Sequence, residues 1–152
     1  MGSYTITRAV DVDADLATCH ALVDDFHEWT KWSPWEDVDP ALQRTYSGPD
    51  RGVGARYAWS GNRKAGRGSM EIVGSTPEQI DVKLVFEKPW RAENPVAFRF
   101  EPAGEGTRVT WTMDGENKGV AAVFAKVVNM DKLLGRDFDK GLSRLKGVAE
   151  QG

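Results

Sequence analysis

Few side chains in this 152-residue sequence are of the types that support metal or nucleophilic chemistry at close spacing. There are two histidines, His20 and His27, and one cysteine, Cys19. Zinc sites place cysteine and histidine ligands at short regular spacings such as CxxC or HxxxH, and neither spacing occurs here. The sequence therefore predicts no metal site and no bound cofactor.

Cys19 recurs with Leu16, Val23 and Phe26 at helical spacing, which places its thiol on an apolar helix face. A nucleophilic thiol needs a nearby base to form the thiolate. His20 follows directly in the sequence, but on a helix it should point about 100° away. We therefore expect a buried, structural cysteine.

General acid–base chemistry needs only one carboxylate or imidazole with a shifted pKa. His27 is the proton carrier most readily placed in a site, although a solvated or capping role is favoured. Asp114 and Glu116 lie at the end of the last predicted strand, near the start of the C-terminal segment, whereas Glu71 and Arg56 fall on outer strand positions and should be exposed. No Ser/His/Asp arrangement can be argued from the spacing, so no catalytic group is named.

Tryptophan is the more informative residue, because three of the six fall within one segment, at Trp29, Trp32 and Trp35. Indole carries a large apolar area and one N–H donor, which suits the wall of a cavity. The segment is polar and interrupted by Pro34, so it does not read as an ordinary core helix. We expect it to border a pocket, with Trp29 partly buried at the mouth.

The elements that would position these residues are one strand, two short helices, six further strands and a long helix. The predicted strands cover residues 4–12, 42–47, 53–59, 68–72, 80–86, 96–100 and 107–113. The predicted short helices cover residues 16–25 and 26–32, and residues 120–128 also read as helical. The long helix follows from Leu134, Phe138, Leu142, Leu145 and Ala149, which repeat at spacings of three and four.

Short turns between these strands favour an antiparallel sheet with one wet face. Period-two alternation predicts which side chains face inward. The strand and tryptophan candidates are Trp32, Trp35, Tyr57, Trp59, Met70, Ile72, Leu84, Phe86, Phe98, Phe100, Trp111 and Met113, with Val53 and Ala55 on the face of Tyr57. The helix or lid candidates are Phe124, Met130, Leu134 and Phe138. Each could also be ordinary core.

Composition bounds the possible partners and the number of domains. A net charge of -3 argues against a nucleic-acid surface, which needs clustered Lys and Arg. No apolar run approaches the ~18 residues that a membrane span requires, and the N-terminus lacks a signal-peptide pattern. We expect a cytoplasmic protein in which residues 1–152 form one domain.

Several motifs along the chain resemble a known family. They are Trp32-Ser33-Pro34-Trp35-Glu36, Asp39-Pro40, Tyr46-Ser47-Gly48-Pro49, Gly52-Val53-Gly54-Ala55, Trp59-Ser60-Gly61-Asn62, Gly66 with Gly68, Gly106-Thr107-Arg108-Val109-Thr110-Trp111, and Asp137-Phe138 with Gly141-Leu142 and Leu145-Lys146. With this order of elements, the chain resembles the START/Bet v 1-like (SRPBCC) superfamily, and within it bacterial proteins of the polyketide cyclase/dehydrase type. The resemblance implies an α+β helix-grip fold, in which a curved seven-stranded antiparallel sheet wraps around the long C-terminal helix.

The resemblance also implies a cavity between sheet and helix for a small, largely hydrophobic or aromatic molecule, such as a lipid or a polyketide-like compound. Three functions remain open. The chain could bind such a ligand, act as a cyclase/dehydrase-type enzyme through the same cavity, or serve as a protein-interaction module similar to Hsp90 activators. The sequence leaves the ligand, any reaction and the choice between monomer and homodimer undetermined.

Overall fold

The computed structural model describes residues 3–34, 41–61, 66–88, 92–116 and 130–151. Its strands are β1 (Ser3–Val12), β2 (Gln43–Ser47), β3 (Arg56–Ser60), β4 (Arg67–Thr76), β5 (Gln79–Lys88), β6 (Ala92–Ala103) and β7 (Gly106–Glu116). Its helices are α1 (Leu16–Asp24), the 3-10 helix η1 (Glu28–Lys31) and α3 (Met130–Gln151). The two short helices predicted after the first strand are therefore present, the second as a single 3-10 turn. The helix predicted at residues 120–128 lies outside the described residues.

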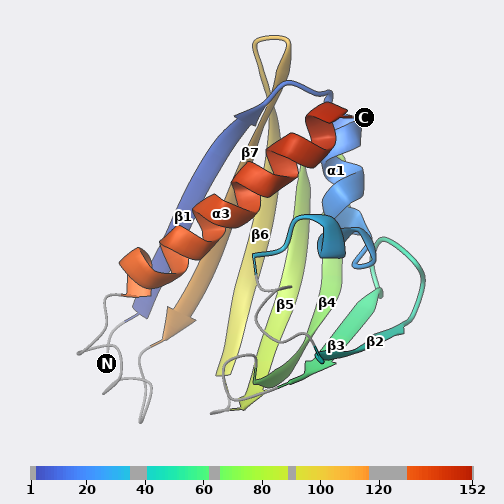
Figure 1. Cartoon of the computed structure of the whole chain (residues 1–152), viewed down its shortest axis with the longest axis vertical. Coiled ribbons are helices and arrows are strands. Elements are labelled where there is room, and N and C mark those ends of the chain that lie inside the picture. The colour runs from blue at the N-terminus through green and yellow to red at the C-terminus, as the bar shows by residue number, and fades with distance from the viewer. Residues whose placement is uncertain (1–2, 35–40, 62–65, 89–91, 117–129, 152) are drawn as a thin grey trace.

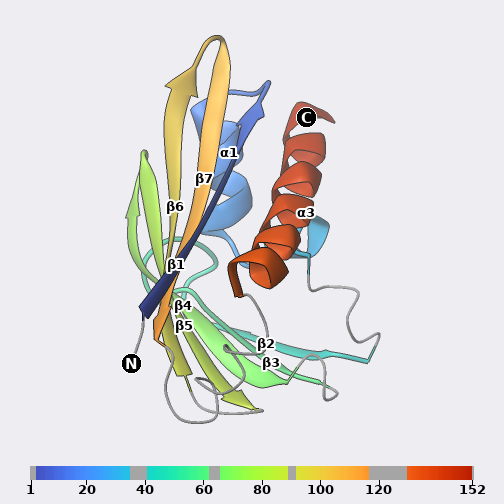
Figure 2. The ribbon, with the colours of Figure 1, turned by 90° about the vertical axis from the view of Figure 1, so that its left-hand side faces the viewer.

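The strands form one antiparallel sheet in the order β1-β7-β6-β5-β4-β3-β2. Helix α3 runs obliquely across the sheet on the side of β1 and β7 (Figure 1). The turned view shows α1 and α3 on the same face, while β2 and β3 curve away below them (Figure 2). This is the predicted α+β helix-grip fold.

A bulge in β4 contributes to the curvature of the sheet. Ile72 pairs with Val82 and Gly74 pairs with Asp81, so Val73 is the extra residue between them. Its side chain is 51% exposed. An extra residue in one strand bends it and increases the local twist, and here the bend lies between Ile72 and Ser75.

Helix α1 begins where the sequence predicts, because Asp15 caps it. The Asp15 carboxylate accepts a hydrogen bond from the Thr18 backbone N–H at 2.8 Å, which satisfies one of the open donors of the first turn. At the other end, Trp29 Nε1 donates to the carbonyl of Val23 at 2.8 Å, and Trp32 Nε1 donates to that of Leu22 at 2.9 Å. The two indoles therefore fasten η1 to the end of α1.

The expectation that Trp29 would be partly buried at a cavity mouth is wrong. The residue is 4% exposed, and its ring packs edge-on against Phe98 and Trp111. The last carbonyls of a helix lack intrahelical donors, and an indole N–H that supplies one draws its ring into the core. The Trp29–Trp32 spacing thus serves helix capping and core packing.

The prediction that Val53 would share an inward strand face is also wrong. Strand β3 begins only at Arg56, and Val53 is 59% exposed. Gly52 and Gly54 flank it with φ of 78° and 97°, backbone angles that favour glycine. The two glycines make this segment a turn.

Two glycines of α3 should respond in opposite ways to alanine. A Cβ on Gly141 would lie 2.8 Å from Pro34 Cδ and 3.0 Å from Trp111 Cζ3, whereas nothing lies within 4 Å of one on Gly147. We expect Gly141→Ala to lower the free energy of unfolding by about 1–3 kcal/mol through overpacking. Gly147→Ala should raise it by about 0.5–1 kcal/mol through helix propensity. Urea denaturation measures both changes in the free energy of unfolding. If both changes had the same sign, α3 would not pack against Pro34 and Trp111 as closely as the structure shows.

Candidate functional site

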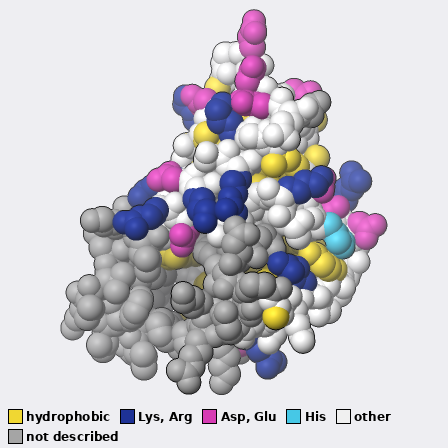
Figure 3. Space-filling model, viewed as in Figure 1, with side chains coloured by type: hydrophobic (Ala, Val, Ile, Leu, Met, Phe, Trp, Pro, Cys, Tyr) yellow, Lys and Arg dark blue, Asp and Glu magenta, His cyan; other side chains and the backbone are white. Residues whose placement is uncertain are grey.

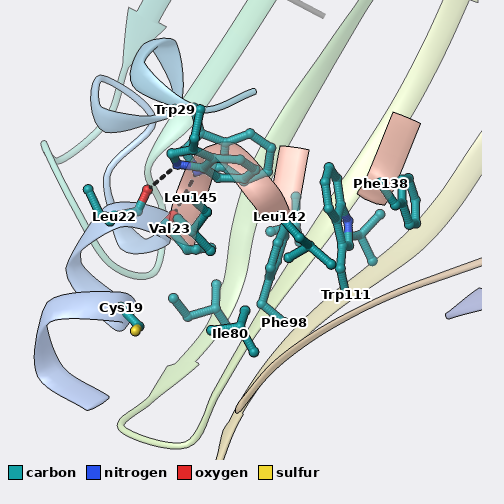
Figure 4. Close-up of a cluster of buried hydrophobic side chains, with 14 of the residues drawn as sticks. Cys19, Leu22, Val23, Trp29, Ile80, Phe98, Trp111, Phe138, Leu142 and Leu145 are labelled. Atoms are coloured by element: carbon teal, nitrogen blue, oxygen red, sulfur yellow. Dashed lines mark hydrogen bonds between the residues drawn. The ribbon is translucent and has the colours of Figure 1, made fainter. Parts of the chain in front are cut away.

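One end of the concave face is filled and sealed by side chains. Two cross-strand rows form this packed core: Ile80–Phe98–Trp111 on β5, β6 and β7, and Ile72–Val82–Val96–Met113–Ile6 from β4 to β1. All eight residues are buried. Trp111 stacks on Phe138 of α3 with ring centroids 4.1 Å apart, and Leu142 and Leu145 of the same helix close over the group (Figure 4). These side chains pack against one another and are shielded from solvent.

The other end of the concave face is less completely covered. Its two rows, which we call the β2–β6 surface, are Tyr46–Tyr57–Met70–Leu84–Asn94 and Arg44–Trp59–Gly68–Phe86. Tyr57, Leu84 and Asn94 are buried, whereas the side chains of Tyr46, Met70, Trp59 and Phe86 are only partly buried. Contiguous apolar side chains that are not fully covered are a feature of ligand-binding grooves, so this end is the candidate site.

Aromatic contacts order this surface. Trp59 meets Phe86 edge-on at 5.8 Å and lies nearly parallel to Tyr57 at 6.2 Å, and Tyr57 contacts Tyr46 at 5.4 Å. A Cβ on Gly68 would lie 2.6 Å from Trp59 Cη2. Glycine at this position is therefore what allows the indole to lie across β4.

Two polar side chains share the β2–β6 surface, and neither was among the predicted site residues. Asn94 is 4% exposed, and its Nδ2 donates to the Asp114 carbonyl at 3.0 Å. The Nε of Arg44 is buried. Strand parity could have indicated both, because Asn94 precedes the inward Val96 by two residues and Arg44 precedes Tyr46 by two.

The structure divides the predicted lining between the two ends. The packed core holds Trp32, Ile72, Phe98, Phe100, Trp111, Met113 and Phe138. The β2–β6 surface holds Tyr57, Trp59, Met70, Leu84 and Phe86. Leu134 is partly buried on α3. Trp35 and Phe124 lie outside the described residues, and so does the side chain of Met130, where α3 begins.

The candidate proton carriers lie away from the packed core. His27 is half exposed, and its Nδ1 lies 2.8 Å from Asp25 Oδ1. Asp114 is exposed and accepts a hydrogen bond from Thr5 Oγ1 at 2.6 Å. Among the described residues, no group of three or more His, Cys, Asp or Glu side chains could hold a metal ion.

Arg56 and Glu71 form an ion pair at 3.3 Å on the outer face of the sheet, as their strand positions predict. With side chains that reach solvent, such a pair contributes little to stability. It takes no part in the concave face.

A cluster that sequence spacing did not indicate joins α1 to β4. Ser75 Oγ donates to Asp24 Oδ1 at 2.8 Å and lies 3.5 Å from His20 Nε2. In nucleophilic triads the imidazole lies between serine and carboxylate, whereas here the hydroxyl lies between the other two. The cluster is a structural tie, and Ser75 faces inward only because the bulge at Val73 shifts the strand parity.

Cys19 is the buried structural cysteine that the sequence predicts. Burial raises the pKa of its thiol above the usual value, so the thiol stays protonated at neutral pH. A protonated, buried thiol is a poor nucleophile, and Cys19 plays no chemical part in the site.

A small open pocket adjoins the β2–β6 surface at its β2 end. Its volume is about 190 Å³, and its lining residues are Phe26, His27, Tyr46, Ser47, Gly48, Pro49, Asp50, Ala55 and Arg56. Pockets for drug-sized ligands usually measure about 300–1,000 Å³, so this one is small for a main ligand site.

The described part of the face in Figure 3 mixes positive and negative side chains, with hydrophobic side chains showing in small patches between them. Within the ranges that the structure describes, no helix has the length and hydropathy to span a membrane.

Solved structures share this fold. A protein of Rhizobium leguminosarum aligns with a TM-score of 0.70 at 14% identity, over 99% of this chain and 97% of that one. Ara h 8.0201 aligns with a TM-score of 0.68 at 13% identity, over 99% and 100%. The Aha1 dimer from Colwellia psychrerythraea aligns with 0.63 at 17%, over 97% and 96%. At these identities the likeness shows the fold, which is that of the START/Bet v 1-like (SRPBCC) superfamily.

No curated protein matches the sequence. The pattern of one protein family, described as polyketide cyclase / dehydrase and lipid transport, matches residues 3–150, nearly the whole chain. The chain therefore belongs to the polyketide cyclase/dehydrase and lipid transport family.

Proposed function

We propose that the chain binds a small, largely hydrophobic or aromatic molecule, lipid or polyketide-like, against the β2–β6 surface and beneath α3. The observation that carries this proposal is the contrast between the two ends of the concave face. At one end the inward side chains are buried against one another, whereas the other end presents partly buried aromatic and apolar side chains in two continuous rows. The family description, which includes lipid transport, supports the same function.

The free energy of such binding would come from covering apolar surface. Each Å² of apolar surface removed from water contributes about 25 cal/mol, and aromatic rings at offset or edge-on angles add specific contacts. The proposed contacts are Tyr57, Trp59, Met70, Leu84 and Phe86 on the sheet, with Leu134 on α3. The predicted lining residues in the packed core lie in the neighbouring rows of the same face, and Trp35 and Met130 remain predictions.

The direct test is uptake of a neutral fluorescent probe, N-phenyl-1-naphthylamine, and of a panel of lipophilic compounds. Native mass spectrometry should show one molecule bound per chain, and tryptophan fluorescence should change in proportion to occupancy. If no compound of the panel binds and no co-purified molecule is found, the proposal fails.

Asn94 favours a second candidate function, a cyclase/dehydrase-type enzyme that uses the same surface. It is a buried amide among apolar inward side chains, held by its bond to the Asp114 carbonyl, and could orient a carbonyl or hydroxyl of a substrate. Removing one such oriented group typically lowers kcat by about 10²–10³-fold.

We expect Asn94→Leu to discriminate between the two functions. If the chain is an enzyme, the variant should keep probe uptake and lose turnover of a poly-β-ketone substrate, measured by chromatography of the products. If the chain only binds, the wild type and the variant should both release the substrate unchanged.

A further inference from the structure

The His27–Tyr46 pair lies where the small pocket meets the β2–β6 surface. The two rings stack with centroids 4.0 Å apart and planes 18° apart. Both side chains line the pocket. On its other side Tyr46 contacts Tyr57, which leads to Trp59 and Phe86. Tyr46 therefore separates a solvent-open pocket from the proposed ligand contacts.

We propose that Tyr46 closes an entrance to the ligand site and that His27 is the pH-sensitive latch that holds it closed. This inference rests on the proposed function. The pocket, at about 190 Å³, gives the phenol ring a space beside its present position. When Tyr46 moves into that space, the buried ring of Tyr57 becomes reachable from the solvent side.

The charges around His27 determine which protonation state holds Tyr46 in the closed position. Asp25 Oδ1 lies 2.8 Å from its Nδ1 and forms an ion pair with the ring when the imidazole is charged. A cation over an aromatic face is attracted to it, so the imidazolium also holds the Tyr46 ring more firmly. Asp50 and Arg56 are the other charged groups lining the pocket, and Arg56 is paired with Glu71.

Imidazole ordinarily changes charge between about pH 5 and 8. The latch is therefore closed at the acidic end of this range and opens as the pH rises. Neither His27 nor Tyr46 is among the proposed ligand contacts. The latch should therefore change the rates of ligand uptake and release together. Equal binding to both states leaves the equilibrium affinity nearly unchanged.

Stopped-flow uptake of N-phenyl-1-naphthylamine, which stays neutral in this range, provides the kinetic test. The wild type should take up the probe about two- to fivefold more slowly at about pH 5.5 than at about pH 8, the change expected of one exposed cation–π contact. His27→Gln should show no such difference. His20→Gln, which removes the other histidine, should behave as the wild type, and Tyr46→Ala should be fast at both pH values.

A ligand-free measurement separates the latch from the binding proposal. The NMR signals of the Tyr46 ring should shift between about pH 5.5 and pH 8 in the wild type and stay constant in His27→Gln. If they do not shift while the probe still binds, the latch is wrong and the proposed function stands. If they shift but no compound binds, the proposed function fails, and the entrance fails with it.

Discussion

Replacing Trp111 with alanine should lower the free energy of unfolding by about 3–5 kcal/mol, the usual cost of deleting a large buried aromatic side chain. Trp111 is 2% exposed and contacts side chains of the sheet, of α3 and of the segment that follows η1. It stacks on Phe98 at 4.9 Å and on Phe138 at 4.1 Å, and it meets Trp32 edge-on at 5.7 Å. Its removal would open a cavity between the sheet, η1 and α3 together.

Urea denaturation of the purified variant measures this loss. Val73→Ala is the matched control, because it shortens an exposed side chain of the same sheet and should change stability by less than about 0.5 kcal/mol. A loss below about 1 kcal/mol for Trp111→Ala would mean that this end of the concave face is not tightly packed. The division of the face into a filled end and a binding end would then be wrong.

The second large effect concerns binding. Trp59→Ala should weaken the affinity for N-phenyl-1-naphthylamine by at least about tenfold, which corresponds to 1.4 kcal/mol. Tryptophans that anchor a binding site commonly exceed this value when truncated. Trp59 is only partly buried, so the variant should lose less stability than Trp111→Ala.

A fluorescence titration measures this effect, with Val85→Ala as the control on the outward face of β5. Trp59→Phe, which keeps an aromatic ring over Gly68, should retain part of the affinity. If Trp59→Ala binds the probe as tightly as the wild type does, the ligand does not lie on the β2–β6 surface. These outcomes, set beside those of Trp111→Ala, separate a binding defect from a folding defect.

Sequence alternation predicted the interior of the sheet well, because each strand from β4 to β7 has one dry face. Ile72, Leu84, Phe98 and Trp111 are buried as their parity requires. The long helix followed from the spacing of Phe138 and its neighbours for the same reason. A strand or helix whose apolar residues recur at a regular spacing among polar ones has one face to bury.

The structure differs from the sequence-based predictions where local backbone geometry overrides the alternation of apolar and polar residues. Val53 follows strand parity in the sequence but lies in a glycine turn, and Ser75 faces inward because a bulge adds one residue to β4. The burial of Trp29 depends on a hydrogen bond to a helix carbonyl. Nothing in its spacing reveals that bond.

The site is less predictable than the fold, because the same aromatic residues can fill a core or line a cavity. Trp59 and Trp111 both read as inward from their strands, and only the placement of α1, η1 and α3 distinguishes them. The apolar alternation does not indicate Asn94, because its side chain is polar. Its burial becomes meaningful once the register places it beside Leu84.

The most direct test of the binding site is an NMR titration of methyl groups with N-phenyl-1-naphthylamine. We expect the methyl signals of Met70 and Leu84 to shift in proportion to occupancy, while those of Ile80, Leu142 and Leu145 in the packed end stay in place. Large shifts at Ile80, Leu142 and Leu145 with none at Met70 and Leu84 would contradict this expectation, and so would binding that leaves all five unchanged.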